Sequence, residues 1–144
     1  MRPYHRIVLT LTLALAPALA SCSDLFGTPH IVLRQVRIDT ASTPPVVPTN
    51  VSRGVPFIVE IPVWTGTCSE QGPVEIEPQG TGVLVTPYRR HEYRRNVVCS
   101  GVAVLETYTV ELEWEREIDF EVLISAYDDW TGTLSIFRYP VVVE

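Results

Sequence analysis

Residues 102–114, VAVLETYTVELEW, are the longest segment of the chain in which apolar and polar side chains alternate regularly. The period of two and the β-branched and aromatic content predict a long β-strand with one buried face. Glu111, Glu113 and Glu115 lie on its polar face. Glu106 interrupts the apolar face, so we expect a strand end, a bulge or a hydrogen-bonded partner there. The other positions of the apolar face are Val102, Val104, Tyr108, Val110, Leu112 and Trp114.

The same period appears on both sides of this segment. Residues 55–64, VPFIVEIPVW, alternate most cleanly. Because proline cannot donate a ladder hydrogen bond, Pro56 and Pro62 predict that this strand has a neighbour on one side at most, or that its donors face solvent. Residues 40–50 contain three prolines and predict an extended loop or an edge segment of polyproline II character. The remaining strand candidates are residues 30–39, 74–77, 83–86, 89–98, 118–126 and 133–143.

These segments predict seven to eight strands, with no helical period beyond the N-terminal region. Short strands separated by turn signals resemble an immunoglobulin-like β-sandwich. The resemblance covers residues 30–144 and implies an all-β fold, a single domain of two packed antiparallel sheets. A jelly roll or a small barrel is the alternative, because Trp64 precedes Cys68 instead of lying between Cys68 and Cys99.

The N-terminal region has the composition of an export signal. Arg2 and Arg6 precede an apolar run over residues 7–20, which is typical of a secretory signal peptide. The run ends in Leu19-Ala20-Ser21-Cys22, which resembles the lipobox of bacterial lipoproteins. The resemblance implies cleavage before Cys22 and a lipid on its thiol. The alternative is cleavage after an A-x-A site at residues 18–20, which would release a soluble protein with a free thiol.

The lipobox resemblance also implies an organisation and a location for the chain. Residues 1–21 are then a signal peptide, residues 22–29 a lipidated tether and residues 30–144 the β-sandwich domain. The first partner is a membrane of the bacterial cell envelope, bound through the anchor. Ser23 stands where many lipoproteins retained at the inner membrane carry Asp, so the resemblance favours the outer membrane, facing the periplasm or the cell surface.

The chain contains three cysteines, an odd number for an exported protein. The lipobox resemblance accounts for it, because it implies that lipid occupies Cys22 and that Cys68 and Cys99 form a disulfide in an oxidising compartment. Two separate buried thiols are the alternative.

The balance of charge restricts the class of partner. The formal net charge is −6, and loss of Arg2 and Arg6 with the signal peptide would bring it to about −8. A chain with this balance lacks the basic surface of a nucleic-acid-binding protein. We therefore expect no nucleic acid among its partners, and an envelope protein or a glycan instead.

One segment departs from the acidic character of the chain. Its candidate anion-binding residues are Arg89, Arg90, His91, Arg94 and Arg95. Arginine presents planar donors that suit carboxylate, sulfate or phosphate, so the cluster is a candidate site for an anionic glycan or an acidic protein. In an extended strand, Arg90 and Arg94 share one face while Arg89, His91 and Arg95 share the other. The favoured alternative is that the arginines pair across a hairpin with Glu111, Glu113 and Glu115, because sequential strands are usually neighbours.

The sequence contains no pattern that predicts catalysis. Motifs such as GxSxG, HExxH, CxxC and a glycine-rich phosphate loop are absent. Asp128 and Asp129 lack the spacing of a calcium loop and fit an Asx-type hairpin turn. We therefore expect a non-catalytic binding or structural module without a metal or another cofactor.

Overall fold

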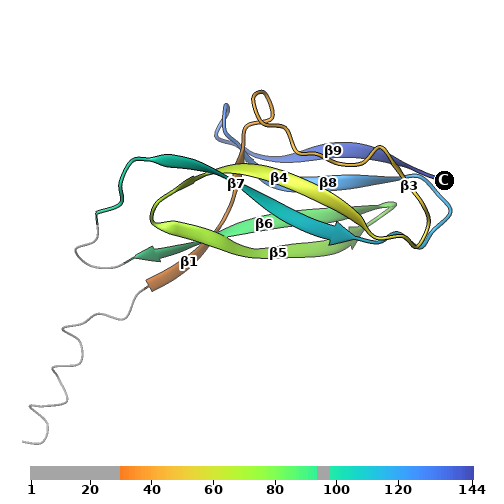
Figure 1. The fold of residues 1–144 in the computed structure, drawn as a ribbon, viewed down its shortest axis with the longest axis horizontal. Coiled ribbons are helices and arrows are strands. Elements are labelled where there is room, and N and C mark those ends of the chain that lie inside the picture. The colour runs from red at the N-terminus through yellow and green to blue at the C-terminus, as the bar shows by residue number, and fades with distance from the viewer. Residues whose placement is uncertain (1–29, 94–97) are drawn as a thin grey trace, which may run out of the picture.

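The computed structural model describes residues 30–93 and 98–144, which form two sheets and contain no helix. The nine strands of this part of the chain are β1 (His30–Gln35), β2 (Arg37–Ile38), β3 (Asn50–Val51), β4 (Phe57–Gly66), β5 (Ser69–Gln79), β6 (Gly82–Tyr93), β7 (Ala103–Leu112), β8 (Phe120–Asp128) and β9 (Leu134–Val143). Figure 1 shows the longer strands running along the long axis of the molecule.

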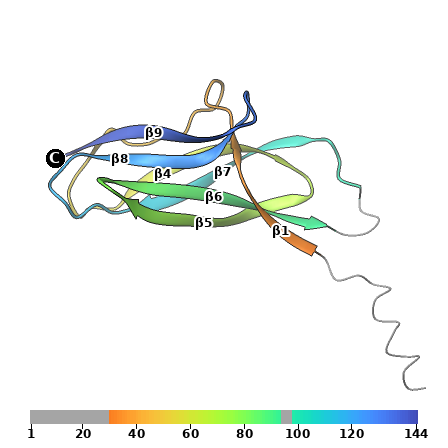
Figure 2. The same cartoon turned by 180° about the vertical axis from the view of Figure 1, so that it is seen from behind.

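The two sheets differ in size. β4 and β7 form an antiparallel pair, in register from Phe57 opposite Leu112 to Gly66 opposite Ala103. The other seven strands form the larger sheet, in the order β1-β6-β8-β9-β3, with β5 on β6 and β2 on β8. Most of its long pairs are antiparallel, whereas β6 and β8 run parallel. Figure 2, from behind, shows the larger sheet covering the β4–β7 pair.

Apolar side chains from both sheets meet between them. The alternation in β4 places Val59, Ile61 and Val63 inside, each fully buried. Val122 and Ile124 of β8 face them from the larger sheet and are equally buried. Burial of such side chains is the main favourable contribution to folding, at about 25 cal/mol per Å² of apolar surface.

The structure confirms the predicted all-β sandwich, while a closed barrel is not formed by the described residues. The strand expected at 102–114 is β7, and the expected loop at 40–50 meets β4 through mutual backbone hydrogen bonds between Val46 and Glu60. In the described part of the chain β7 is the one strand that pairs with β4, as Pro56 and Pro62 predict, while the second edge of β4 carries the isolated bridge to Val46.

One expected pairing is wrong. The arginine-bearing strand, β6, and the acidic strand, β7, do not form a hairpin, because they belong to different sheets. Both edges of β6 are already occupied, one by β5 and the other by β8 and then β1. The chain therefore crosses from the larger sheet to the smaller one between Tyr93 and Ala103.

The larger sheet also opens locally between two of its strands. β8 pairs with the first part of β6, at residues 82–85, whereas β1 pairs with the last part, at residues 88–93. Val36, between β1 and β2, bridges the opening, since its N–H donates to Pro87 O at 3.2 Å and its carbonyl accepts from Tyr127 N at 2.9 Å. The N-terminal strand is thus inserted where β6 and β8 diverge.

Candidate functional site

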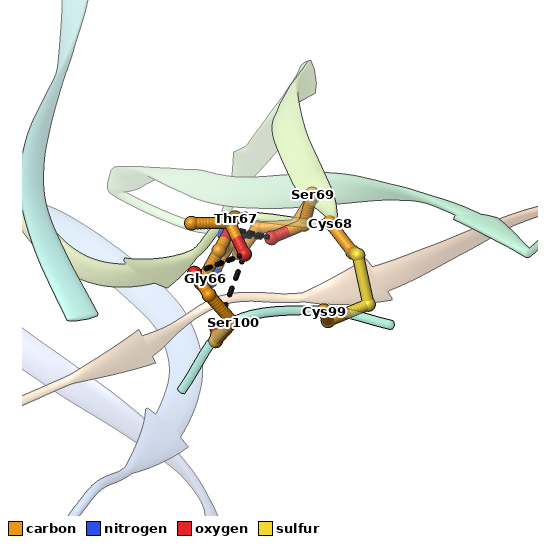
Figure 3. The surroundings of a disulfide bond; sticks show 7 residues. Gly66, Thr67, Cys68, Ser69, Cys99 and Ser100 are labelled. Carbon is orange, nitrogen blue, oxygen red and sulfur yellow. Dashed lines mark hydrogen bonds between the residues drawn. A yellow bond between two sulfur atoms is a disulfide. The ribbon is translucent and has the colours of Figure 1, made fainter. Parts of the chain in front are cut away.

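Cys68 and Cys99 form a disulfide, with their Cα atoms 5.4 Å apart. Cys68 lies in the turn between β4 and β5, and Cys99 lies in the connection from β6 to β7, so the bond joins two crossings between the sheets (Figure 3). Beside it, Thr67 Oγ1 donates to Ser100 O at 3.1 Å and accepts from Ser100 Oγ at 3.0 Å. The predicted pairing is confirmed, and it closes one end of the sandwich.

Arg89 points into the sandwich at this same end. It is 8% exposed, and its Nη1 donates to Trp64 O of β4 at 3.0 Å. Its Nη2 donates to Ser69 Oγ, at the start of β5. Burial lowers the pKa of the Arg89 guanidinium, while the nearby Tyr108 and Glu106 act in the opposite direction. Arg89 therefore joins the two sheets and is not accessible to a ligand on the surface.

Two further side chains connect the sheets beside Arg89. The Tyr108 hydroxyl of β7 donates to Tyr88 O at 2.6 Å and accepts from Gly72 N at 3.4 Å. Gln71 Nε2 of β5 donates to Thr107 O at 2.9 Å. Burial raises the pKa of Tyr108, so its hydroxyl keeps its proton and remains a donor. At this end of the sandwich, the two sheets are therefore joined by hydrogen bonds in addition to apolar packing.

Glu106, which interrupted the apolar pattern of its strand, lies half-buried in this polar region. Its charge acts on Arg89 and favours the charged guanidinium. Glu106 Oε2 and Arg89 Nε are both buried without a hydrogen bond to the described residues. The expected strand end or bulge is not formed, because Glu106 lies within β7 in unbroken register opposite Val63, and Oε2 has no hydrogen-bonded partner within the described part of the chain. The nearby charge of Arg89 offsets the cost of burying this carboxylate instead.

The other members of the arginine cluster are divided between two faces, as expected for an extended strand. Arg90 is exposed on the outer face of the larger sheet, opposite Leu33 of β1. His91 is half-buried on the same face as Arg89, and its ring stacks on Tyr93 with centroids 6.4 Å apart. Arg94, Arg95 and Cys22 lie outside the described residues.

The acidic row lies far from these arginines in the fold. Glu111 of β7 is opposite Ile58 of β4, so the expected pairing of Arg89 and Arg90 with the glutamates is wrong. A hydrogen bond with Glu115, and then the charge of Glu115, raise the pKa of Glu113, as expected where carboxylates lie side by side. The expected pairing of arginines and glutamates is wrong because β7 pairs with β4, in the smaller sheet, and not with β6.

The outer face of the larger sheet carries a pocket that sequence reasoning missed. It has a volume of ≈ 600 Å³ and is lined by Leu33, Arg34, Gln35, Arg37, Tyr88 and Tyr127. These residues come from three separate segments of the chain, so no local spacing in the sequence predicts the pocket. Arg34 is opposite Arg89 across the β1–β6 pair, so its side chain is on the other face of β1, where its guanidinium lies over the Tyr93 ring, 5.9 Å from the centroid.

The remaining sequence expectations concern metals and membranes. Asp128 Oδ1 accepts from Thr131 N at 2.8 Å, which confirms the Asx-type turn. Within residues 30–93 and 98–144, no group of His, Cys, Asp and Glu has the arrangement of a metal site, and no helix is long and apolar enough to cross a membrane.

Comparison with protein-family models, curated proteins and solved structures finds no match.

Removal of the disulfide by a Cys68→Ala/Cys99→Ala double substitution should lower the free energy of unfolding. The bond closes a loop with a sequence separation of 31, for which the chain-entropy model gives about 3 to 4 kcal/mol. Urea unfolding monitored by tryptophan fluorescence measures the change. An unaltered unfolding midpoint would contradict the assignment of this bond as the closure of the sandwich.

Arg89→Ala should destabilise the fold by about 2 to 3 kcal/mol, because it leaves the Trp64 carbonyl and the Glu106 carboxylate without their buried cation. Arg90→Ala is the matched control: it removes the neighbouring arginine from the exposed face and should change stability by less than about 0.5 kcal/mol. Thermal unfolding of both variants measures the difference. Equal effects would exclude the structural role assigned to Arg89.

His91 should make stability depend on pH. Burial, and then the charges of Arg89 and Arg34, lower the pKa of His91 from the ordinary value of 6.5. The unfolded chain therefore takes up a proton first, so this contribution is present above about pH 6.5 and is lost as the pH falls through the lowered folded pKa. His91→Gln should flatten the decline of Tm over that range, whereas His30→Gln, at an exposed position, should leave its slope unchanged.

Proposed function

We propose that this chain is a lipid-anchored, non-catalytic protein of the bacterial cell envelope whose β-sandwich is a binding or structural module. The observation that carries the proposal is the disulfide between Cys68 and Cys99. Disulfides form and persist in oxidising compartments and are rare in the cytosol. The bond therefore supports export, and with it the interpretation of residues 1–21 as a signal peptide and of Cys22 as the lipidated residue.

The positions of the chain ends fit an anchored domain. β1 begins at His30 opposite Tyr93, at the end of the sandwich closed by the disulfide, while Glu144 lies at the opposite end (Figure 2). A tether over residues 22–29 spans at most about 26 to 29 Å. An anchor on Cys22 would keep the disulfide end near the membrane and direct the other end away from it.

The chemistry of the anchor makes attachment stable. Each buried CH₂ of an acyl chain contributes about 0.8 kcal/mol, so one chain holds a protein only marginally and two or three hold it firmly. Mature lipoproteins carry that number of chains, and the resemblance of Leu19-Ala20-Ser21-Cys22 to a lipobox assigns them to Cys22. Ser23 favours the outer membrane.

Cys22→Ser should move the protein from the membrane fraction to the soluble fraction, because it removes the lipid attachment point. Ser23→Asp is the matched control: it keeps the lipid and, by the same resemblance, should shift the protein to the inner membrane. Fractionation followed by mass spectrometry of the N-terminal peptide measures both. Membrane retention of Cys22→Ser, or an unmodified Cys22 in native material, would overturn the proposal.

Recognition of an anionic glycan or an acidic protein through the arginine cluster is the alternative function. The positions of the arginines limit which of them could contact such a ligand. Arg89 is committed to the interior, and Arg90 faces away from it. An anion-binding surface on this segment would therefore depend on Arg90, Arg94 and Arg95. Arg90 also lies opposite Leu33, which lines the pocket on the outer face.

A further inference from the structure

We propose that the pocket on the outer face of the larger sheet binds a saccharide that carries a single carboxylate. Its lining includes two tyrosines, the amide of Gln35, the apolar Leu33 and Arg37. Arg34 also borders it, but its guanidinium lies over the Tyr93 ring on the other face of β1. A volume of ≈ 600 Å³ is within the usual range for small-molecule sites and has room for a disaccharide. The proposal does not depend on the lipid anchor.

The pocket has a topological origin. It lies where β6 and β8 diverge and the β1–β2 segment is inserted between them, held by the two backbone hydrogen bonds of Val36. Gln35 is opposite Tyr88 across the β1–β6 pair, and Arg37 is opposite Tyr127 across the β2–β8 pair. The lining is therefore built on paired strands and is preformed in the protein.

Hydrogen bonds fix the floor of the pocket. Gln35 Nε2 donates to Ser125 Oγ at 3.3 Å, and Gln35 also hydrogen-bonds the Tyr88 hydroxyl. The Tyr88 hydroxyl in turn donates to Glu75 Oε2 at 2.9 Å. This network crosses β8, β1, β6 and β5, so the amide and the ring are held in place before a ligand arrives. Pre-organisation of this kind lowers the entropy that binding costs.

Two tyrosine rings give the pocket an affinity for sugars. Tyr88 and Tyr127 come from the strands on either side of the inserted segment, and Tyr127 is 37% exposed. The face of an aromatic ring carries partial negative charge and attracts the slightly positive C–H groups on the face of a pyranose. The hydroxyls and the Gln35 amide offer hydrogen bonds to the hydroxyls of the sugar.

The charges in the pocket select a carboxylate. Arg37 lines it and Arg90 lies opposite Leu33 at its rim, on the same face of the sheet, and none of the lining residues is acidic. The carboxylate nearest to Arg37 is Asp129, at 3.7 Å in an exposed pair, which is worth little and is easily replaced. A guanidinium can bind a ligand carboxylate through two parallel hydrogen bonds.

The rest of the molecule limits the charge of the ligand. The chain has a net charge of −6, so a polyanion such as nucleic acid meets long-range repulsion that a ligand with one negative charge largely avoids. A single carboxylate on a sugar ring satisfies both the local positive charge and the acidic surroundings.

Titration of the purified full chain with cellobiouronic acid, followed by NMR, tests the proposal. Amide shifts should concentrate at Gln35, Arg37, Tyr88 and Tyr127, and cellobiose, which lacks the carboxylate, should bind about tenfold more weakly. Arg37→Gln should weaken binding of cellobiouronic acid about tenfold. Asp129→Asn should strengthen it, because it removes the competing carboxylate.

The controls separate this site from the anchor and from stability. Arg53→Gln removes another exposed arginine, one paired with Glu117, and should leave binding unchanged. Cys22→Ser should bind as tightly as the parent chain, so failure of the anchor and failure of the pocket are distinguishable. Equal affinity for cellobiose, equal affinity for an acidic dipeptide at the same residues, or no shift at the pocket would each overturn the proposal.

Discussion

The disulfide between Cys68 and Cys99 is the constraint on which the arrangement of the sheets depends. The chain crosses from one sheet to the other in the turn that holds Cys68 and crosses back in the connection that holds Cys99. A small sheet of only β4 and β7 covers part of a much larger one, and this bond fastens them where apolar packing ends. Arg89 and Tyr108 complete the closure from inside with hydrogen bonds between the sheets.

Because Arg89 takes part in this closure, the arginine cluster does not form a single binding surface. A guanidinium inside the sandwich donates to a backbone carbonyl and a hydroxyl, so Arg89 contributes to cohesion between sheets and not to recognition. Its neighbour Arg90 projects to the other face because side chains alternate along a strand. The arginines on the outer face near the pocket are instead Arg37, in the segment inserted where β6 and β8 separate, and Arg90 at the rim.

Much of the fold could be predicted from local pattern. The period of two identified β4, β7 and β8 and the residues that fill the core, among them Val59 and Ile61, and the prolines of β4 indicated its limited pairing. The candidate site was less predictable. The pairing of Cys68 with Cys99 was expected correctly, whereas the pairing of Arg89 with the glutamate row was wrong, because adjacency in sequence was taken for adjacency in a sheet.

Local alternation was sufficient to predict β4, β7 and β8 and the buried face of β4, because it is a property of neighbouring residues and needs no knowledge of the partner strand. It did not predict the extents of β5 and β6, since the candidates at 74–77, 83–86 and 89–98 are parts of these two longer strands. Which strands pair with one another depends on contacts between distant segments and follows from the tertiary fold alone. β6 pairs with β5 along one edge and with β8 and β1 along the other. No edge of β6 is therefore left for β7 to pair with. The burial of Arg89 and the pocket beside Tyr88 both follow from this choice of partners, since each is assembled from strands far apart in the chain.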